Sequence, residues 1–483
     1  MTSPAERALD RLRGALGDVV DGGAVDSTPA TVEAMRTDKS GHDSGSTPVA
    51  VVTARSIADV QETLRIASDL RIGVVTRGAG TGLAGGAIAG RDEIVLSTLA
   101  LDDITDLSVA DETVVVGPGI INAELNRRLE PHGLWYAPDP ASKAISTIGG
   151  NIATNAGGLL CAKYGVTREA VLGLTIVRAD GTVMTLGHRT VKGVTGLDLT
   201  ALVIGSEGTL GVIVDATLKL RPLPTGVVAT IGAYFADIVS AAGAAAAITA
   251  AGLRPAAMEL LDSLALEHIG VHLDLELGDR GRAFLLVQTD GDASVSEAER
   301  VLAIIRSLGG DADLTTDPEE GERLLAIRRA FHPALEARGT VLIEDVAVPR
   351  SALPQMFAAI ATIGERFALD IPTVAHAGDG NLHPNFLFAG DEVPPRVWEA
   401  AHEVFRAALD LGGTLTGEHG VGVLKRRWLA DELGDDQVRL QHDIKRVFDP
   451  LGILNPGKLF PADIRHADIR PADSGHPETE DHS

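Results

Sequence analysis

Two histidines and one glutamate have the residue types and spacing that metal chemistry requires. His376 and His383 bracket a turn-forming segment that reads AGDGNL. If its central DG pair forms a two-residue hairpin turn, the two histidines lie opposite each other with Cβ atoms roughly 5 Å apart. On a helix, a rise of ~1.5 Å per residue would separate them by about 10 Å. Glu418 follows in the run GEHG. Two imidazoles and a carboxylate match a catalytic metal site with an open position.

We therefore predict that His376, His383 and Glu418 bind a divalent metal. The ligand set favours zinc, and Mn²⁺ or Fe²⁺ would accept the same residues. For the histidine pair taken alone, a surface turn with incidental histidines is the commoner case, and the glutamate is what favours a metal. One function for such an ion is the activation of water in a metal-dependent hydrolase. In that alternative, the glycine-rich loops described below are structural.

The composition indicates a soluble globular protein with room for two or three domains. The chain has 483 residues, 45 % of them hydrophobic, and a formal net charge of −25. So acidic a chain is a poor binder of phosphate backbones, which excludes nucleic acid as a partner. A single cysteine, Cys161, excludes internal disulfides and fits a reducing compartment. With no secretory signal and no apolar run long enough to span a bilayer, we expect a cytoplasmic protein without a transmembrane segment.

A strand–helix–strand unit precedes the first glycine-rich loop. Residues 1–46 are polar and predict a loosely held arm with one helix near residues 4–17. A β-like run at 49–53, a helical pattern over 57–70 that begins with the capping signature S-x-x-D, and a β-like run at 72–76 follow. The chain then enters RGAGTGLAGG, residues 77–86.

This loop contains the spacing G-x-G-x-x-G at Gly80, Gly82 and Gly85. The nicotinamide-dinucleotide fingerprint requires a helix to open at the third glycine, but a β-like run, residues 93–97, follows instead. Glycine permits positive φ and close backbone approach, so successive N–H groups can form a nest for phosphate oxygens. We predict that the loop binds a pyrophosphate without the help of a helix dipole.

A second unusual run, residues 146–158, reads STIGGNIATNAGG and follows the tripeptide PDP at 138–140. Its isoleucines and the leucines after it favour a packed loop over a disordered linker. Such a loop offers backbone donors to a flat polar ring system. A third Gly/Ser turn, residues 205–213, leads into a strand, and the prolines at 222 and 224 end the domain.

Together these runs resemble the FAD-binding half of the vanillyl-alcohol-oxidase/p-cresol-methylhydroxylase flavoprotein superfamily. They are most similar to its FAD-linked D-2-hydroxyacid dehydrogenase branch, which comprises glycolate oxidase subunits, D-lactate dehydrogenases and D-2-hydroxyglutarate dehydrogenases. The matching runs cover roughly residues 47–460 in the family's order. They are RGAGTGLAGG, PDP, TIGGNIATNAGG, KYG, GSEGTLGVI, HAGDGNLHPNF, GEHGVG and GILNPGKLF.

The resemblance implies an α+β protein with a two-subdomain FAD-binding domain of the PCMH/VAO type and an α/β cap domain. The cap would be an antiparallel sheet with helices on one face. We expect an N-terminal arm (1–46), the FAD-binding domain (47–224), the cap (225–415), a C-terminal segment that returns to the FAD domain (416–464) and a disordered tail (465–483).

The resemblance also implies the FAD contacts. The pyrophosphate would be held by Arg77, Gly78, Ala79, Gly80, Thr81, Gly82 and Leu83. The isoalloxazine would be lined by Ser146, Thr147, Gly149, Gly150, Asn151, Thr154, Asn155, Gly157 and Gly158. The ADP side would be contacted by Glu207, Gly208 and Ile213, and Pro138, Asp139 and Asn455 complete the set. We see no pattern for a histidyl or cysteinyl attachment, so the FAD is expected to be non-covalent.

Arg328 stands where the family places the arginine that binds the substrate carboxylate, and we expect it on a charged helix over residues 322–338. We expect FAD-dependent oxidation of a small (D)-2-hydroxy acid, lactate or glycolate first. The metal would polarise the hydroxyl, His419 would remove its proton, and hydride would pass to flavin N5. His332, expected on the same helix face as Arg328, is the alternative base. At Ile343 the hydroxyglutarate enzymes carry a basic residue, so its absence disfavours a dicarboxylate substrate.

The sequence leaves the partners open. The electron acceptor could be a quinone, a cytochrome, an electron-transfer flavoprotein or oxygen, and a homodimer is compatible with the sequence. A further alternative is a flavin-binding subunit of a glycolate oxidase-type complex that needs partner subunits for turnover.

Overall fold

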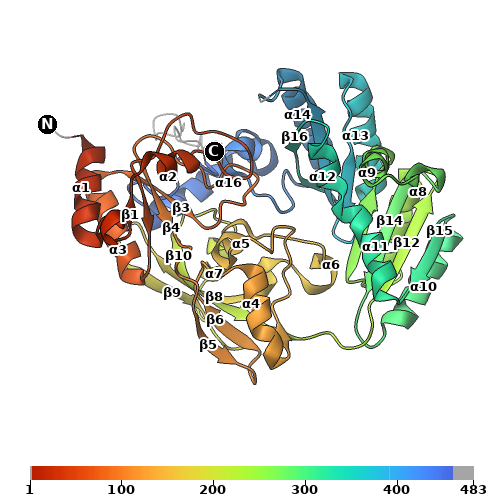
Figure 1. Ribbon diagram of the computed structural model, residues 1–483, viewed down its shortest axis with the longest axis horizontal. Coiled ribbons are helices and arrows are strands. Elements are labelled where there is room, and N and C mark those ends of the chain that lie inside the picture. Colours follow the sequence, from red (N-terminus) through yellow and green to blue (C-terminus); the bar gives the residue numbers. More distant parts are fainter. Residues whose placement is uncertain (1–2, 391, 461–483) are drawn as a thin grey trace, which may run out of the picture.

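The structure is a computed structural model that describes residues 3–390 and 392–460, so the predicted tail (465–483) lies outside the described residues. The chain folds into two lobes (Figure 1). The larger lobe combines residues 3–222 with the C-terminal segment, and the smaller lobe is formed by the part of the chain between them. Helices and largely antiparallel sheets occur together, which confirms the predicted α+β class.

The first subdomain of the larger lobe is a four-stranded sheet accompanied by three helices. Its strand order is β1-β2-β4-β3, in which only β1 is antiparallel to its neighbour. The strands are β1 (Val25–Asp26), β2 (Ala50–Thr53), β3 (Gly73–Arg77) and β4 (Glu93–Ser97), and the helices are α1 (Pro4–Leu16), α2 (Pro29–Ala34) and α3 (Ile57–Leu70). The Ser56 side chain caps α3 by accepting a hydrogen bond from the Asp59 N–H at 3.2 Å, as its signature predicts.

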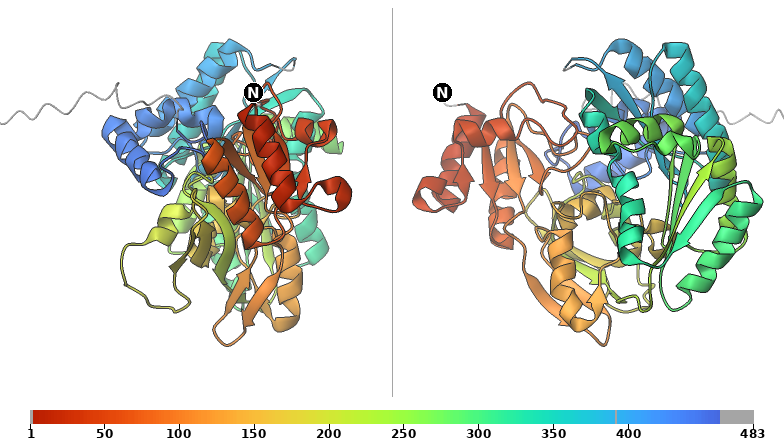
Figure 2. Two further views of the ribbon diagram at one scale, coloured as in Figure 1. Left: turned by 90° about the vertical axis from the view of Figure 1, so that its left-hand side faces the viewer. Right: turned by 45° about the vertical axis from the view of Figure 1, so that its right-hand side comes forward.

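The N-terminal segment is an integral part of this subdomain. Ala8 and Leu12 of α1 are fully buried in the core that α3 also lines, and α1 lies against α3 (Figure 2, left). Val25 brings β1 into the sheet beside β2. The prediction that residues 1–46 are loosely held is therefore wrong for their described part. The apolar positions of this segment are few and spaced apart, and their partners lie on elements that come later in the chain.

The second subdomain is a five-stranded antiparallel sheet with strand order β5-β6-β10-β8-β9. Its strands are β5 (Ile104–Ser108), β6 (Thr113–Val116), β8 (Val171–Val177), β9 (Val183–Gly187) and β10 (Val212–Lys219), and β7 (Leu134–Trp135) pairs separately with β11 (Arg221–Pro222). The helices are α4 (Asn122–Leu129), α5 (Ile148–Thr154), α6 (Cys161–Tyr164) and α7 (Leu199–Val203). Isoleucine and valine side chains from β6, β8 and β10 pack with α4 and α5 in one core.

The smaller lobe, the cap, is built on a single antiparallel sheet. Its strand order is β15-β12-β14-β13-β18-β19-β16, and β17 also pairs with β19. The strands are β12 (Ala229–Phe235), β13 (Ala257–Leu261), β14 (Ala283–Thr289), β15 (Asp311–Thr315), β16 (Thr340–Ile343), β17 (Val346–Ala347), β18 (Thr373–His376) and β19 (Asn381–Phe388). The helices are α8 (Ile238–Ala250), α9 (Ser263–Leu273), α10 (Ser294–Ser307), α11 (Pro318–Arg329), α12 (Phe331–Glu336), α13 (Leu353–Phe367) and α14 (Pro395–Asp410).

Helices cover both faces of the cap sheet, whereas the resemblance implied one face. On one face, α8, α10, α13 and α14 pack over strand residues such as Leu260 and Leu285. On the other, α9, α11 and α12 pack over Leu261 and Leu286 (Figure 2, right). Successive residues of a strand point to opposite faces. Val374 belongs to the second face, so the face that carries α11 is also the one to which His376 points.

After the cap the chain returns to the larger lobe through α15 (Gly422–Lys425) and α16 (Leu429–Phe448). Leu454 then forms a parallel bridge with Val74 of β3. The Val74 N–H donates to the Ile453 carbonyl at 2.7 Å, and the Asn455 N–H donates to the Val74 carbonyl at 2.8 Å. Short 3₁₀ helices lie at Val19–Asp21, Glu130–His132, Thr167–Ala170, Leu277–Asp279, Arg350–Ala352 and Arg426–Trp428. In the described part of the chain, no helix combines the length and apolar character needed to cross a membrane.

Candidate active site

The two predicted metal-binding histidines lie on one face of a hairpin whose register differs from the predicted one. His376 pairs with Asn381, His383 pairs with Val374, and residues 377–380 form the turn. The turn has four residues instead of two because the N–H groups of both Asp379 and Gly380 bond the His376 carbonyl at 3.0 Å. The pairing therefore shifts by two positions, which keeps both imidazoles on the same face as diagonal neighbours. Their ring centroids are 5.1 Å apart.

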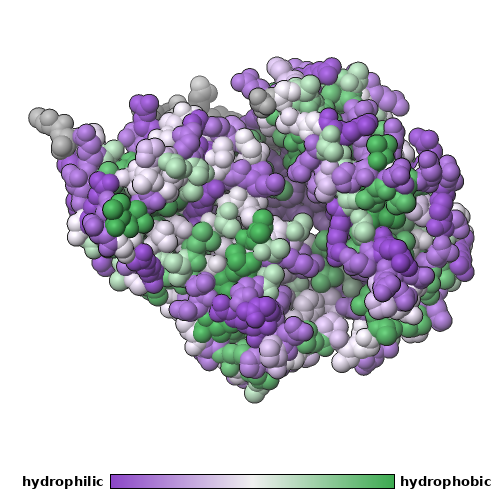
Figure 3. Space-filling view, viewed as in Figure 1, coloured by the Kyte–Doolittle hydropathy of each residue, from purple (hydrophilic) through white to green (hydrophobic). Residues whose placement is uncertain are grey.

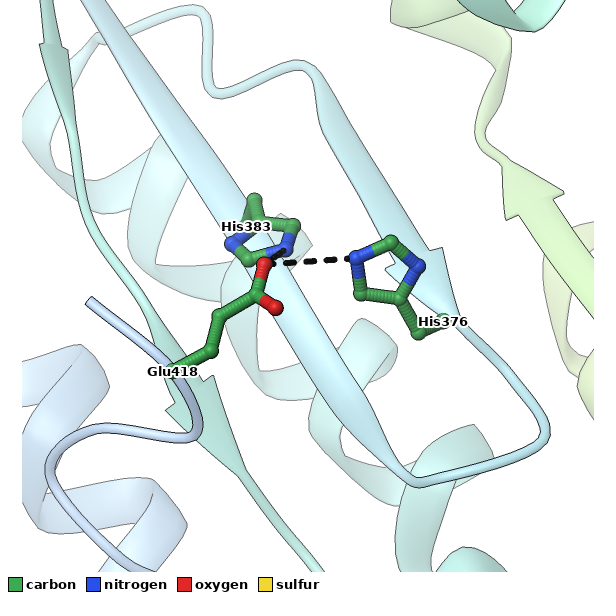
Figure 4. Close-up of side chains that lie close together, drawn as sticks. All are labelled: His376, His383 and Glu418. Carbon is green, nitrogen blue, oxygen red and sulfur yellow. Dashed lines mark ion pairs between the residues drawn. The ribbon is translucent and has the colours of Figure 1, made fainter. Parts of the chain in front are cut away.

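Glu418 joins the two histidines from the segment that follows the cap (Figure 4). Its Oε1 atom lies 3.4 Å from His376 Nε2 and 3.2 Å from His383 Nε2. One ligand atom from each of the three residues lies within 4.8 Å of the others. Both histidines are buried, so water does not compete freely for these atoms. The donor set and its convergence fit a divalent metal such as zinc.

The charges around this cluster suit a cation. Burial lowers the pKa of His376, but the carboxylates of Glu259 and Glu418 raise it well above its usual value. Burial raises the pKa of Glu418, but His376 and His383 hold it well below its usual range. A site that draws a proton this strongly has a negative potential, and a divalent cation can take the place of the proton.

Asp345, between β16 and β17, holds the segment that carries Glu418. Its buried carboxylate accepts hydrogen bonds from the N–H groups of Glu418 and His419, both at 3.0 Å. It also accepts bonds from Thr416 Oγ1 at 2.5 Å and Asn381 Nδ2 at 2.6 Å. Burial raises the pKa of Asp345, but the nearby positive groups lower it overall, so the residue stays ionised. One carboxylate thereby joins the hairpin to the GEHG run.

His419 lies beside the metal cluster. Its ring stacks on that of His383, with centroids 4.9 Å apart and an interplanar angle of 11°. Its Nε2 atom is 4.0 Å from Glu418 Oε1. Burial lowers the pKa of His419 to about 4, so the imidazole is neutral near pH 7 and able to accept a proton.

Arg328 reaches the same site from the last turn of α11. Its Nε–H donates to Glu259 Oε2 at 2.7 Å, and its side chain is 11 % exposed. The helix predicted over residues 322–338 is divided at Ala330 into α11 and α12, so Arg328 and His332 do not share one helix. His332 is nevertheless close to the site. Burial, followed by the charges of Arg328, His383 and His419, lowers its pKa to about 3.

The glycine-rich loop over residues 77–86 is followed by strand β4 and by no helix, as predicted. Gly80 and Gly85 have φ values of +70° and +73°, which favour glycine. The Arg77 guanidinium stabilises the loop conformation, because its Nη1 donates a hydrogen bond to the Ala87 carbonyl at 2.7 Å. A Cβ atom on Gly82 would meet only Asp38 Oδ2, at 3.9 Å. The backbone at Gly82 is thus open to a ligand, and Ala79, Thr81 and Leu83 lie beside it in the loop.

The run over residues 146–158 contains helix α5, where the sequence predicted a loop. Thr147 Oγ1 caps this helix by accepting the Gly150 N–H at 3.2 Å, and Asn155, with φ +52°, ends it. Four of its residues are glycine, asparagine or threonine, which have low helix propensity, so the cap and burial stabilise it. Gly78 of the glycine-rich loop is packed against Thr147, so the two runs are in contact.

Buried polar atoms in this region lack partners among the described residues. They include Ser146 Oγ, Asn151 Nδ2 and Thr76 Oγ1. Buried polar groups are nearly always hydrogen-bonded, so these three atoms are available to a polar ligand. An aromatic ring system with several polar atoms, such as the isoalloxazine of FAD, would use them. The residues present therefore fit the cofactor.

The end of the same run touches the metal cluster. A Cβ atom on Gly157 would lie 2.5 Å from Glu418 Oε2, and one on Gly158 would overlap the backbone of Asp139. Pro138 and Asp139 are buried beneath this contact, while Gly149 and Thr154 lie within α5. The space-filling view shows a recess between the two lobes (Figure 3). The predicted isoalloxazine segment and the predicted metal ligands are thus direct neighbours.

Glu207 and Asn455 connect three segments of the larger lobe. The Glu207 carboxylate accepts the N–H groups of Val421 at 2.6 Å and Gly422 at 2.8 Å. Asn455 Nδ2 donates to the carbonyls of Gly86 at 3.0 Å and Glu207 at 2.6 Å. The Ile213 side chain packs in the core of the second subdomain. The side chains of Glu207 and Ile213 are thus used within the protein, so the predicted contact with the ADP side would have to use backbone groups, such as those of Gly208 at φ +74°.

Three residues of the site were missed by sequence reasoning: Glu259, Asp345 and Lys425. Glu259 is the single acid in the apolar strand β13, and that isolation was the available signal. Asp345 follows the apolar run of β16 directly after another acid, Glu344. Lys425 is buried and donates to the carbonyls of Asp345 at 2.9 Å and Leu415 at 3.2 Å. Each of these contacts joins residues that are far apart in the chain or on separate elements, so no local pattern specifies it.

Comparisons with known proteins agree with this arrangement. The family model described as "FAD binding domain" matches residues 48–187, and that of "FAD linked oxidases, C-terminal domain" matches residues 226–459. The glycolate oxidase subunit GlcD of Bacillus subtilis (strain 168) is 39 % identical, covering 87 % of this chain and 90 % of that protein. The D-lactate dehydrogenase of Archaeoglobus fulgidus is 35 % identical, covering 85 % and 90 %. A structure of p-cresol methylhydroxylase with substrate bound shares the fold, with a TM-score of 0.78, 17 % identity and coverage of 95 % and 97 %.

Proposed function

Because this chain belongs to the family of FAD-linked oxidases that includes glycolate oxidase subunits and D-lactate dehydrogenases, we propose that it oxidises a small (D)-2-hydroxy acid to the 2-oxo acid. The chain is an FAD-dependent oxidoreductase that acts on CH–OH donors. Lactate and glycolate are the first candidate substrates. The observation that carries the proposal is the convergence of Arg328, His419 and the His376–His383–Glu418 cluster beside Gly157.

Each of these residues has a distinct task. Arg328, with its Nε–H engaged by Glu259, keeps the hydrogens of its two terminal nitrogens for the substrate carboxylate. His419 accepts the hydroxyl proton at Nε2, the nitrogen that lies towards Glu418. His376, His383 and Glu418 would hold the metal, and the loops around Gly82 and Asn151 would hold the FAD. When bound, the metal supplies a Lewis acid and the FAD a hydride acceptor.

The character of Ile343 favours a small substrate. This residue ends β16 and is half-buried, opposite Asn385 of β19. An apolar side chain offers no partner to a second carboxylate, and an unpaired buried charge is costly. We therefore propose monocarboxylic acids of two to five carbons in preference to dicarboxylates.

A substrate screen with an artificial dye acceptor tests this function. It would cover 2-hydroxy acids of two to five carbons in both hands, including a dicarboxylate. Dye reduction with D-lactate or glycolate is expected, and a protein that is active only on a dicarboxylate would contradict the role given to Ile343. A yellow protein that oxidises none of the acids unless other subunits are added would be a flavin-binding subunit. That outcome is of interest because relatives at 39 % and 36 % identity are described as subunits.

The FAD is proposed to be non-covalent. The residues that line its site offer backbone and side-chain hydrogen bonds, and the one cysteine, Cys161, is half-buried with a pKa that burial raises. Acid precipitation of the purified protein should release all yellow colour to the supernatant. Colour that stays in the pellet would contradict non-covalent binding.

A further inference from the structure

Glu259 lies between the metal cluster and the arginine and contacts both. It sits in β13 directly opposite His376 of β18 and is completely buried. Its Oε1 atom is 2.7 Å from His376 Nδ1, and its Oε2 atom accepts the Arg328 Nε–H at 2.7 Å. Both oxygens of one carboxylate are therefore engaged, one by a metal ligand and the other by the carboxylate-binding arginine.

We infer that Glu259 is a positioning residue that couples metal binding to the binding of the substrate carboxylate by Arg328. This inference rests on the proposed function. A carboxylate accepts hydrogen bonds and donates none at neutral pH. Facing Glu259 Oε1, His376 must carry its proton on Nδ1, which leaves the lone pair of Nε2 directed at the cluster. Nε2 is the atom that lies 3.4 Å from Glu418. Glu259 thus selects the imidazole tautomer that can bind a metal.

The same carboxylate orients Arg328. A guanidinium is planar, so fixing its Nε–H also fixes the plane and the direction of the two terminal nitrogens. Arg328 comes from a helix and His376 from a strand, and within the described residues Glu259 is the group that hydrogen-bonds to both. A change at His376 on metal binding would reach Arg328 through one shared carboxylate. Metal binding at His376 and the orientation of Arg328 should therefore be coupled.

A purely structural ion pair is the competing explanation. Exposed pairs of this kind occur on the same helix, such as Arg329 with Glu322, whose side chains are 60 % and 59 % exposed. The Glu259–Arg328 pair differs, because a fully buried carboxylate loses its hydration and needs strong compensation. A structural role predicts a loss of stability when Glu259 is changed, but no specific change in zinc affinity. The two explanations therefore differ in a quantity that can be measured.

The experiment compares Glu259→Gln with a control, Asp262→Asn, in the full-length flavoprotein. An amide offers one accepting oxygen and one donating nitrogen, so it cannot accept from both His376 and Arg328. Asp262 is a half-buried acid just beyond β13, but it accepts from Ala265 and Thr373 and touches neither site residue. Both variants are stripped with a chelator, checked for retained flavin, and titrated with zinc alone.

The expected result is a ~10–100-fold loss of zinc affinity in Glu259→Gln and wild-type affinity in Asp262→Asn. KM for the hydroxy acid should also rise in Glu259→Gln. That rise should be smaller when Arg328→Lys is already present, because the two residues act through one contact. If Glu259→Gln does not fold, Glu259→Asp serves instead. Its shorter side chain cannot reach both partners, so the same losses are expected in weaker form.

Wild-type zinc affinity in a folded Glu259 variant would overturn the inference, as would an equal loss in the Asp262 control. Strictly additive effects of Glu259→Gln and Arg328→Lys on KM would overturn the part of the inference that concerns Arg328. The zinc titration needs no substrate, so it is independent of the substrate screen. A protein whose zinc affinity depends on Glu259 but which oxidises no 2-hydroxy acid would overturn the proposed function and leave standing the part of this inference that concerns the metal.

Discussion

The two lobes build their halves of the site in different ways. In the larger lobe, the predicted flavin contacts lie mainly in contiguous runs, and several glycines in these runs, such as Gly78, Gly149 and Gly158, are required because the backbone passes close to other atoms. In the cap, the site residues come singly from separate elements: Glu259 from β13, Arg328 from α11 and His376 from β18. One half is a set of loop conformations, and the other is a set of side chains assembled by sheet register and helix packing.

This difference has a functional consequence. A loop that binds through its backbone loses a whole binding site when its conformation changes, whereas a cap side chain acts through the few groups that it contacts. Single substitutions of a metal-binding histidine or of Arg328 should therefore remove one chemical task each and leave the flavin bound, and Glu259, which contacts both His376 and Arg328, is the exception. Substitutions in the glycine runs should change flavin binding, except where a run touches the cap.

The largest effect is expected from His376→Ala or His383→Ala. Each change removes a metal ligand that the cap supplies, so metal and nearly all activity should be lost while the flavin spectrum is kept. Metal content measured beside the visible spectrum tests this. His272→Ala, an exposed histidine on α9, is the matched control and should keep both. Stoichiometric metal in both ligand variants would show that the cluster is not the metal site.

His419→Gln should lower kcat by ~10²–10⁴-fold with KM nearly unchanged, because a general base acts only as the proton leaves. The glutamine keeps the approximate size of the side chain but cannot accept the proton at neutral pH. Stopped-flow measurement of flavin reduction separates this step from reoxidation by the acceptor. If flavin reduction kept its wild-type rate, the base would lie elsewhere, and His332 would be tested next with the same substitution.

Arg328→Lys should mainly affect binding. Lysine keeps the charge but loses the planar pair of donors, and a hydrogen bond to a charged group contributes ~1.5–3 kcal/mol. KM should therefore rise about 10- to 100-fold, and kcat should fall less. Steady-state kinetics with D-lactate and glycolate give both constants. Arg329→Lys, on the exposed side of the same helix turn, is the control and should have wild-type constants.

The smallest effect, on the order of tenfold in kcat, is expected from Gly157→Ala, which tests the contact between the predicted isoalloxazine segment and the metal cluster. The added methyl group would press on Glu418 Oε2 and displace a metal ligand from the flavin side. Zinc affinity should fall with flavin retained.

Gly82→Ala is the converse variant, because its methyl group has space in the protein but lies where the pyrophosphate is expected. It should weaken flavin binding and leave zinc affinity unchanged. A loss of zinc affinity with normal flavin binding would show that the loops are assigned wrongly.

Local sequence determined much of the larger lobe. The Ser56 cap and the apolar spacing after it specify α3, and the β-like run that follows the glycine-rich loop was enough to exclude a nicotinamide site. The glycines at positions 80 and 85 occupy left-handed conformations that few other residues adopt. Helix α5 escaped prediction because its residues have low helix propensity, and the Thr147 cap and buried isoleucines stabilise it instead.

The three candidate metal ligands were also predictable from sequence, since two histidines and a glutamate, which have the right chemistry, stand near turn-forming glycines. Their register was not predictable, because a two-residue and a four-residue turn place the same side chains on the same face and differ only in backbone hydrogen bonds. The local sequence does not decide between turns of similar energy. The tertiary structure alone decided that Glu259 and Asp345 lie behind the ligands. Their partners are 117 and 36 residues away in the chain at His376 and Asn381, and contacts at such separations follow from how the strands pair and the helices pack.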